Sequence, residues 1–304
     1  MNPIASVLNE ITETKVEEAD YLGEDGLLYC GKCHTPKQLR LDEGSFFGNR
    51  PLPTMCRCTR ERLERESAEL ERLRHLRRVH ELKYDGFTDD AMRCWTFEND
   101  NGRCAKMAYA RFYVEHFGEM EMENIGYLLW GAVGTGKSYF AACIANALME
   151  REIPVRMTNL SMILNDLNTA NVGRNDIIRQ LNRCRLLILD DFGMERGTEY
   201  ALEQIYSVVD SRYRSRKPLI VTTNLTLTEL KHPPDNAHAR IYDRVLEMCQ
   251  PILISGESMR RINTDEKLQQ LKNRMQAATE MGNSGNTDQG EEDRNDRTQV
   301  SGLL

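Results

Sequence analysis

The sequence has no long hydrophobic run. No stretch approaches the roughly 18 apolar residues that a membrane-spanning helix requires. The opening residues, MNPIASVLNEITETKVEEAD, also lack the basic segment with which a secretory signal begins. We therefore expect a cytoplasmic protein that does not act at a membrane.

The sequence also lacks an excess of positive charge. The formal net charge is −7 over 304 residues, which excludes a uniformly cationic surface for nucleic acid but leaves room for a local basic patch. A disulfide framework is not expected for the nine cysteines, because the cytosol keeps thiols reduced. Four of these cysteines cluster near the N-terminus, and this clustering needs a separate explanation.

The composition changes along the chain and divides it into four zones. Residues 1–58 hold the clustered cysteines, and residues 59–89 begin with a densely charged stretch whose leucines have helical spacing. Residues 90–262 alternate helical patterns with short apolar runs, whereas residues 263–304 have too little apolar surface to fold alone. We predict a small N-terminal domain, a charged helical linker, a larger globular domain and a largely disordered tail.

The larger domain contains short apolar runs that are candidate strands. Near-continuous apolar strands separated by helical stretches are typical of a buried, mostly parallel sheet. We therefore predict an α/β fold with a mostly parallel five-stranded sheet. The candidate strands are YLLW (127–130), PVRMT (154–158), LLILD (186–190), PLIVTT (218–223) and PILIS (251–255).

The stretch GAVGTGKS follows the first candidate strand and matches the phosphate-loop pattern G-x-x-x-x-G-K-[ST]. Glycines let the backbone wrap closely around an anion, and the helix that follows presents its N-terminal dipole to phosphate. Lys137 is placed to reach the β- and γ-phosphates of a nucleoside triphosphate, and the Ser138 hydroxyl is placed to ligate Mg²⁺. The expected nucleotide-binding residues are Gly131, Gly134, Thr135, Gly136, Lys137 and Ser138.

Two further strands end in polar residues that complete the predicted site. Asp190 and Asp191 close the strand in RLLILDDFG, at the edge where ligands bind in open α/β sheets. We expect Asp190 to hold Mg²⁺, directly or through water, and Asp191 to orient or deprotonate the attacking water, unless Asp191 only caps the next helix. Asn224 ends PLIVTTN and is either a turn residue or a contact to the γ-phosphate or the water.

With these elements in this order, residues 96–262 resemble the AAA+ ATPases. Within that class they resemble the DnaC/DnaI-type replicative helicase loaders and the IstB-type transposition helpers. The resemblance implies ATP as the nucleotide, Asn224 as sensor 1, Arg244 as an arginine finger that acts on a neighbouring subunit, and Arg260 as sensor 2. The matching stretches are WTFEN, GAVGTGKS, LLILDDFG, IVTTN, RIYDRV and ISGESMRR.

The sequence leaves alternatives open for the identity of the arginine finger, and it bears on the rate of hydrolysis. Arg244 can instead form a surface ion pair with Asp243 or Glu247, and Arg240 is a competing finger candidate. A finger supplied by a second subunit would make hydrolysis depend on assembly. Many AAA+ motors carry Asp-Glu where this chain carries Asp-Asp, so the shorter Asp191 side chain predicts slow hydrolysis that suits a switch.

The clustered cysteines form two close pairs, Cys30-x-x-Cys33 and Cys56-x-Cys58, separated by a 22-residue loop. Two such pairs can close a tetrahedral Zn²⁺ site, which stabilises short domains without a large core. The second pair has one intervening residue instead of the usual two, so unrelated reduced thiols stay an alternative. The remaining cysteines are expected to be small apolar core residues: Cys94, Cys104, Cys143, Cys184 and Cys249.

A cysteine-rich N-terminal module joined by a charged helix to an AAA+ domain resembles the DnaI-type loaders, whereas the transposition helpers usually lack such a module. The resemblance implies that the N-terminal module grips a hexameric replicative helicase and that the ATPase domain meets single-stranded DNA. We therefore expect an ATP-controlled helicase loader. An IstB-type transposition helper and a nucleotide-binding adaptor without hydrolysis are the alternatives.

A basic stretch in the larger domain bears on DNA binding. SRYRSRKP (211–218) offers four cations around one tyrosine, which can hold phosphates and stack a base. It can equally be the C-terminal end of a helix, where cations suit the dipole. The sequence leaves these two alternatives open.

Overall fold

A computed structural model describes residues 14–41, 50–102, 104–169, 173–193, 198–259, 264 and 267–276. The chain divides into two compact units, Met1–Arg78 and Val79–Leu304. Arg260, the expected sensor 2, and most of the predicted tail lie outside the described residues. Within the described part of the chain, no helix is both long enough and apolar enough to span a membrane.

The first unit contains two pairs of very short strands. β1 (Tyr21–Leu22) pairs antiparallel with β2 (Leu28–Tyr29), and β3 (Gln38–Leu39) pairs antiparallel with β4 (Leu52–Pro53). Its described residues provide almost no apolar core, because burial by hydrophobic side chains is limited to Leu28, Cys30 and Cys56. A unit with so small a core needs another source of stability, such as a metal ion.

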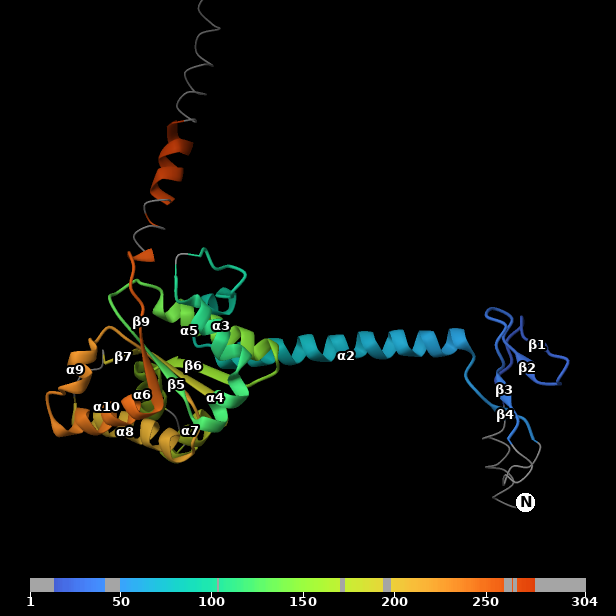
Figure 1. Ribbon diagram of the computed structural model, residues 1–304, viewed down its shortest axis with the longest axis horizontal. Coiled ribbons are helices and arrows are strands. Elements are labelled where there is room, and N and C mark those ends of the chain that lie inside the picture. The colour runs from blue at the N-terminus through green and yellow to red at the C-terminus, as the bar shows by residue number, and fades with distance from the viewer. Residues whose placement is uncertain are drawn as a thin grey trace, which may run out of the picture. The chain divides into compact units, whose positions relative to one another are not determined.

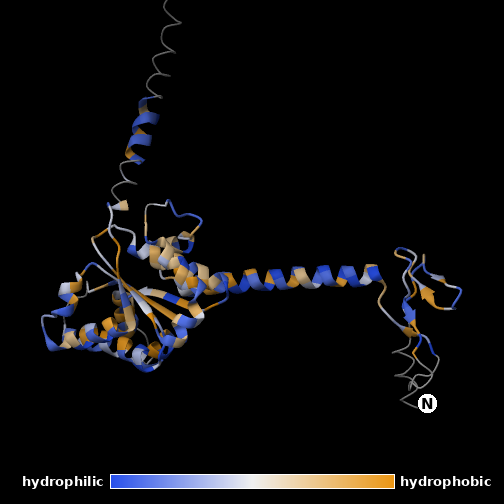
Figure 2. Ribbon diagram, viewed as in Figure 1, coloured by the Kyte–Doolittle hydropathy of each residue, from blue (hydrophilic) through white to orange (hydrophobic). Residues whose placement is uncertain are grey.

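Helix α2 (Arg57–Gly86) has 30 residues and contains the boundary between the two units. The charged stretch that was expected to be helical lies within it. The helix is polar along most of its length (Figure 2), and its opposite charges are spaced for ion pairs such as that between Arg62 and Glu66. Such exposed pairs contribute little to stability individually.

The second unit is built on a parallel sheet of five strands in the order β6-β7-β8-β5-β9 (Figure 1). Each observed strand agrees with its expected range to within two residues at either end, so the predicted α/β fold is confirmed. The strands are β5 (Gly126–Trp130), β6 (Val155–Asn159), β7 (Leu186–Phe192), β8 (Leu219–Thr223) and β9 (Cys249–Leu253).

Helices cover both faces of this sheet (Figure 1). Successive residues of a strand point to opposite faces, so Leu186 and Ile188 pack with one set of helices while Leu187 and Leu189 pack with the other. The first set is α3 (Met107–Glu115), α4 (Phe117–Glu123) and α5 (Lys137–Glu150). The second set is α6 (Leu160–Thr169), α7 (Arg174–Leu181), α8 (Glu199–Arg214) and α10 (Asn236–Met248). The short elements η1 (Asp90–Cys94) and α9 (Leu227–Lys231) complete the unit.

Arg212, near the end of α8, is part of the core. Its side chain is fully buried, and its guanidinium donates to the carbonyls of Cys184, Arg185 and Pro218 at distances of 2.7 to 3.2 Å. Burial lowers the pKa of the Arg212 guanidinium. Arg212 therefore joins the turns that precede β7 and β8, and its buried guanidinium favours the helix-end alternative over contact with DNA.

Two other cations of the basic stretch also have partners inside the unit. Arg214 forms an ion pair of 2.8 Å with Asp210, one helical turn earlier, and the Lys217 ammonium donates to the Asn182 carbonyl at 2.6 Å. Helix α8 ends at Arg214. These contacts favour the helix-end alternative for residues 211–218 over a DNA-binding surface.

The five scattered cysteines differ in their exposure. Cys143, Cys184 and Cys249 are buried among apolar residues, as expected, and Cys104 is half-buried. Cys94 is exposed, so the expectation that it belongs to the core is wrong. It ends η1, whose described residues are all at least partly exposed.

Candidate nucleotide-binding site

A cavity of about 1140 Å³ lies at the carboxyl ends of β5, β7 and β8, against the loop that leads into α5. This is the edge of a parallel sheet at which ligands bind. The cavity is large enough for a nucleoside triphosphate. The expected site residues that line it are Gly134, Thr135, Gly136, Lys137, Ser138, Asp191 and Asn224.

Two glycines of the phosphate loop have conformations and surroundings that exclude a side chain. Gly131 and Gly134 have φ angles of 145° and 83°. A Cβ atom would lie 2.2 Å from the Ile254 carbonyl oxygen at Gly131 and 2.3 Å from the Ser258 Oγ at Gly134. The Met259 N–H also donates to the Gly134 carbonyl at 2.9 Å. The segment after β9 therefore packs directly on the loop, which the sequence did not indicate.

The Lys137 ammonium lies among three oxygen atoms. It donates to the carbonyls of Gly131 and Ala132 at 2.9 and 2.8 Å, and to the Oδ1 atom of Asn224 at 2.7 Å. The residue is 5% exposed. These three acceptors are neutral oxygens, and the Asp190 carboxylate is close enough for a Coulombic interaction with Lys137. The ammonium lies in a partly desolvated site, where a positive charge attracts an anion more strongly than it does in water. The structure thus brings Asn224 to Lys137, the residue expected to reach the β- and γ-phosphates, and this contact favours a site role for Asn224 over that of a simple turn residue.

The two acids of β7 have different environments. Asp190 is 7% exposed, and its Oδ1 accepts a hydrogen bond of 2.6 Å from the Thr222 hydroxyl. Burial raises the pKa of the Asp190 carboxyl, while hydrogen bonds from Thr222 and Ser138 oppose that rise. Asp191 is exposed, lines the cavity and has a φ angle of 53°. One acid is therefore held beside Ser138, and the next faces the space where a nucleotide would lie.

Thr222 is a site residue that the sequence analysis missed. Its hydroxyl donates to Asp190 and accepts the backbone N–H of Asp191 at 3.0 Å, so a single side chain positions both acids. The pairing of β7 with β8 shifts register between Leu189 and Phe192, which turns the chain at Asp191. The signal was the stretch TTN at the end of β8, but only the strand pairing shows which threonine meets Asp190.

The far wall of the cavity comes from the stretch WTFEN and its neighbours. The Trp95 and Tyr139 rings have centroids 6.0 Å apart, and the Tyr139 hydroxyl donates to the Thr96 carbonyl at 2.8 Å. Asn146 of α5 also donates to the Trp95 carbonyl at 2.9 Å, which holds this segment on the helix. Aromatic rings with a few amides are suited to a nucleobase. The lining residues of this wall are Trp95, Asn99, Asn101, Cys104 and Tyr139.

Arg244 does not line the cavity of its own subunit. Its guanidinium forms an ion pair of 2.7 Å with Asp210 of α8 and donates to the Tyr206 hydroxyl at 3.1 Å. The ion-pair partner is therefore Asp210, and not Asp243 or Glu247 as the sequence alternative held.

Two further arginines, Arg240 and Arg260, were candidates for the site. Arg240, the competing finger, is exposed on α10 and also does not line the cavity. Arg260 lies outside the described residues. The segment that precedes it, which lies against the phosphate loop, is described up to Met259.

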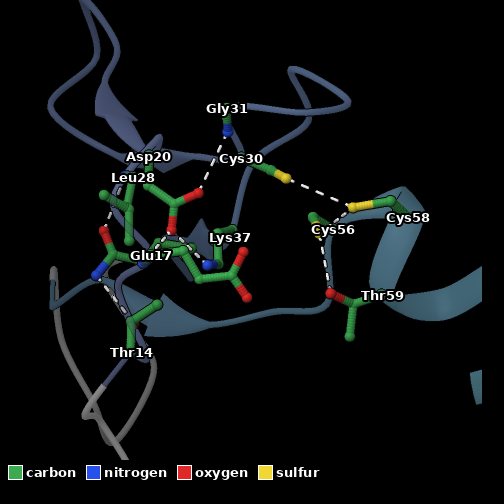
Figure 3. Close-up of polar contacts among 11 residues, drawn as sticks. Thr14, Glu17, Asp20, Leu28, Cys30, Gly31, Lys37, Cys56, Cys58 and Thr59 are labelled. Atoms are coloured by element: carbon green, nitrogen blue, oxygen red, sulfur yellow. Dashed lines mark hydrogen bonds and ion pairs between the residues drawn. The ribbon is translucent and has the colours of Figure 1, made fainter. Parts of the chain in front are cut away.

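The four clustered cysteines converge in the first unit. Their sulfur atoms all lie within 4.8 Å of one another. Figure 3 shows Cys30 and Cys56 pointing toward Cys58, with Sγ–Sγ distances of 3.5 and 3.4 Å to the Cys58 sulfur. A metal–sulfur bond of about 2.3 Å would place the sulfurs of a tetrahedral site about 3.8 Å apart. The donor set and its spacing therefore fit one four-coordinate metal ion.

The surroundings of the cysteine cluster support this geometry. A hydrogen bond with the Thr35 hydroxyl lowers the pKa of the Cys33 thiol to about 5, whereas hydrogen bonds with the other thiols, Cys56 first, raise that of Cys58 to about 12. Such a divergence is expected when thiolates that would repel one another lie close together without a cation. The cluster can therefore hold a metal ion that carries the charge of all four sulfurs.

A nearly buried ion pair between Asp20 and Lys37 stabilises the loop that contains Cys30 and Cys33. Asp20 accepts hydrogen bonds from the Lys37 ammonium at 2.5 Å and from the Gly31 N–H, within the Cys30–Cys33 loop, at 3.2 Å (Figure 3). The Asp20 side chain is 1% exposed. Nothing in the spacing of Asp20 and Lys37 along the sequence distinguishes this pair from ordinary surface charge, so the pair was not predicted.

Comparison with known proteins gives the family. Residues 61–267 match the family described as IstB-like ATP binding protein. Over 137 residues the chain is 31% identical to the putative ATP-binding protein Rv3427c in insertion sequence of Mycobacterium tuberculosis, which covers 44% of this chain and 55% of that protein. Over 175 residues it is 25% identical to the replicative helicase loader DnaI of Bacillus subtilis, which covers 53% of this chain and 56% of that protein.

A crystal structure of DnaI aligns with a TM-score of 0.49 at 23% identity and covers 58% of this chain and 98% of that chain. The matched region spans a little over half the length of the curated relatives. The family match covers more than half of this chain and confirms the expected AAA+ P-loop class and the resemblance to IstB- and DnaC-type proteins. The chain belongs to the family of IstB-like ATP binding proteins.

Proposed function

We propose that this chain is an ATP-dependent helicase loader, which binds a hexameric replicative helicase and delivers it onto single-stranded DNA. The observation that carries the proposal is a four-cysteine unit on the same chain as the nucleotide cavity. The cysteines precede the region that matches the family, which begins at residue 61. An ATPase domain alone would serve a transposition helper equally well, because one relative is named for an insertion sequence and another as a helicase loader.

ATP binding and hydrolysis form the proposed switch. The backbone N–H groups of the loop surround the phosphates, Lys137 contacts the β- and γ-phosphates, and Asn224 contacts the γ-phosphate. Ser138 and Asp190 would hold Mg²⁺, which when bound neutralises charge on the phosphate oxygens. Asp191 orients the attacking water from its exposed position in the cavity. Its short side chain makes turnover slow, so that the protein acts as a switch and not as a motor.

The first unit is the part of the chain that we propose binds the helicase. We assign Zn²⁺ to Cys30, Cys33, Cys56 and Cys58, where it would stabilise a unit with very few buried apolar side chains. The domain limits inferred from composition, 1–58, 59–89, 90–262 and 263–304, belong to the same proposal. Helicase binding is assigned to the first of them.

The proposal includes two further partners, a neighbouring copy of this chain and single-stranded DNA. Arg244 would act as an arginine finger on nucleotide held by a neighbouring subunit, so hydrolysis requires self-association, and Arg260 would contact the γ-phosphate of its own subunit. Single-stranded DNA would bind through cationic side chains other than the buried Arg212, and its affinity would fall steeply with added salt.

Co-purification with the replicative helicase of the same host, with and without ATP, tests the proposal. We expect a complex that depends on the four-cysteine unit and changes with nucleotide. A Cys30→Ser, Cys33→Ser double variant should lose the helicase, and a Cys94→Ser variant, which changes an exposed cysteine outside the cluster, should retain it. No association in either condition would move the assignment to a transposition helper.

The adaptor alternative predicts different kinetics. An adaptor would bind ATP without turnover, whereas a loader should hydrolyse ATP faster in the presence of single-stranded DNA. A rise in turnover with DNA that is lost in Lys137→Ala would exclude the adaptor.

A further inference from the structure

The guanidinium of Arg244 is enclosed by one face of α8. Tyr206, Asp210 and Tyr213 follow one another at intervals of four and three residues, which places them on the same side of the helix. Arg244 pairs with Asp210 at 2.7 Å and donates to the Tyr206 hydroxyl at 3.1 Å. Its guanidinium carbon also lies 4.7 Å from the centroid of the Tyr213 ring. We call Tyr206, Asp210 and Tyr213 the α8 cage.

The α8 cage is itself held in place. The Tyr213 hydroxyl donates to the Glu247 carboxylate at 2.8 Å, which fixes the ring against α10. The side chains of Arg244 and Asp210 are only 22% and 12% exposed, so solvent and salt screen their attraction less than that of a surface pair. A second cation, Arg214, reaches the other Asp210 oxygen from a largely exposed position. Arg244 is thus bound to its own subunit through charge, a hydroxyl and an aromatic ring.

This arrangement conflicts with the action of a free arginine finger. A finger stabilises transferring phosphate by its positive charge, and a carboxylate 2.7 Å away competes for that charge. Arg244 cannot bind the Asp210 carboxylate and a phosphate of a neighbouring subunit with the same donors at the same time. Contact with the neighbouring nucleotide therefore requires the ion pair to Asp210 to be exchanged for one to phosphate.

We propose that the α8 cage withholds Arg244 from catalysis in the lone subunit and releases it when a neighbouring subunit presents bound nucleotide. This inference rests on the proposed role of Arg244 as a finger acting between subunits. It adds Asp210 as the residue that sets how readily the finger is released. Weak turnover by unassembled protein then follows from a contact within each subunit, in addition to the absence of a neighbour.

Mixtures of two full-length variants test the cage separately from the finger. Arg244→Ala subunits keep their nucleotide site but lack a finger, and Lys137→Ala subunits keep the finger but lack the lysine that binds phosphate. Each variant alone should turn over ATP slowly, and the mixture should regain activity. An inactive mixture, with active wild-type protein, would overturn the role of Arg244 between subunits and the cage with it.

The cage is tested by adding Asp210→Asn to one member of that mixture. In the finger donor, Lys137→Ala, it should lower the concentration of donor that gives half-maximal turnover by roughly three- to tenfold, because no carboxylate then competes with phosphate. In the finger acceptor, Arg244→Ala, it should have no effect. An active mixture in which Asp210→Asn in the donor leaves the donor requirement unchanged, or raises it, is the contrary result. That result would overturn the α8 cage but not the role of Arg244 as a finger between subunits.

Two further variants control for indirect effects. Arg214→Gln removes the other partner of Asp210 but keeps the pair with Arg244, so the donor requirement should not fall. Tyr206→Phe removes the hydroxyl that accepts from Arg244 and keeps the ring, so it should shift the donor requirement in the same direction as Asp210→Asn but less. If Asp210→Asn does not fold, Tyr206→Phe tests the α8 cage in its place. An unchanged donor requirement with Tyr206→Phe would then overturn the cage.

Discussion

The Thr222 hydroxyl on β8 donates a hydrogen bond of 2.6 Å to the carboxylate of Asp190 on β7. Thr222 is fully buried and Asp190 is 7% exposed, so this bond replaces water that the carboxylate has lost. The same hydroxyl accepts the N–H of Asp191. A neutral side chain on the neighbouring strand therefore positions both acids of the site.

Replacing Thr222 with valine should change how the site depends on pH. Burial raises the pKa of Asp190 and the hydrogen bond from Thr222 opposes that rise, so loss of the hydroxyl raises the pKa further. A carboxyl with a higher pKa is protonated at a higher pH and is then unable to hold Mg²⁺. The acidic limb of the pH profile for ATP turnover should move to higher pH in Thr222→Val. Within that acidic limb the Mg²⁺ concentration for half-maximal turnover should rise, by up to about tenfold for each unit by which the pKa of Asp190 rises, because protons compete with Mg²⁺ for the carboxylate.

Thr223→Val is the matched control for this experiment. Thr223 is also fully buried, but its hydroxyl donates to the Phe192 carbonyl at 2.7 Å and not to an acid. This variant should lose stability without a shift of the acidic limb. An equal shift in Thr222→Val and Thr223→Val would show that the effect comes from the strand and not from the bond to Asp190.

Arg212 should be essential for folding and not for a DNA-binding surface. Its planar guanidinium donates hydrogen bonds to three backbone carbonyls, and the single ammonium of a lysine cannot reach all of them. Arg212→Lys should lower the free energy of unfolding by about 3 kcal/mol or more, because it leaves buried polar groups unpaired. Urea unfolding followed by circular dichroism measures this change.

Arg214→Lys provides the comparison, because the Arg214 side chain is 73% exposed and lies in the same basic stretch. It should change the free energy of unfolding by less than about 0.5 kcal/mol. Similar small losses in Arg212→Lys and Arg214→Lys would contradict the structural role of Arg212.

The four-cysteine cluster should contain one zinc ion per chain when the protein is purified without chelators. Cys58→Ser should abolish that content, because Cys58 lies close to two other cysteines of the cluster, whereas Cys94→Ser should leave it unchanged. Metal analysis by mass spectrometry gives the stoichiometry. Removal of the ion should unfold the first unit and leave ATP binding by the second unit intact. Equal zinc contents in Cys58→Ser and wild type would contradict the assignment.

Features that depend on neighbouring residues in the sequence were predicted well. The apolar strands, the loop around Lys137 and the two cysteine pairs each follow from a local pattern. The helix after the loop begins at Lys137, as that pattern requires. Local spacing is sufficient in these cases because the residues that act together are close in the chain or at the ends of parallel strands.

Features that depend on register and packing were not predicted. Thr222 meets Asp190 only because β8 pairs beside β7 with a shift of register, and Asp210 meets Arg244 only because α8 packs on α10. Arg212 belongs to a stretch that reads as a solvated helix end, since a sequence does not show where unpaired carbonyls converge. Each of these residues is explained by tertiary contacts and not by its neighbours in the chain.

The cavity should bind ATP with magnesium through Lys137. Calorimetric titration of MgATP into the folded wild-type chain should show saturable binding, and Lys137→Ala should weaken it by at least about tenfold, since it removes the ammonium that contacts the phosphates. Lys231→Ala, which changes an exposed lysine of α9, should bind as the wild type does. Folded wild-type protein that gives no binding, or Lys137→Ala that binds as tightly as the wild type, would show that this cavity is not a nucleotide site that depends on Lys137.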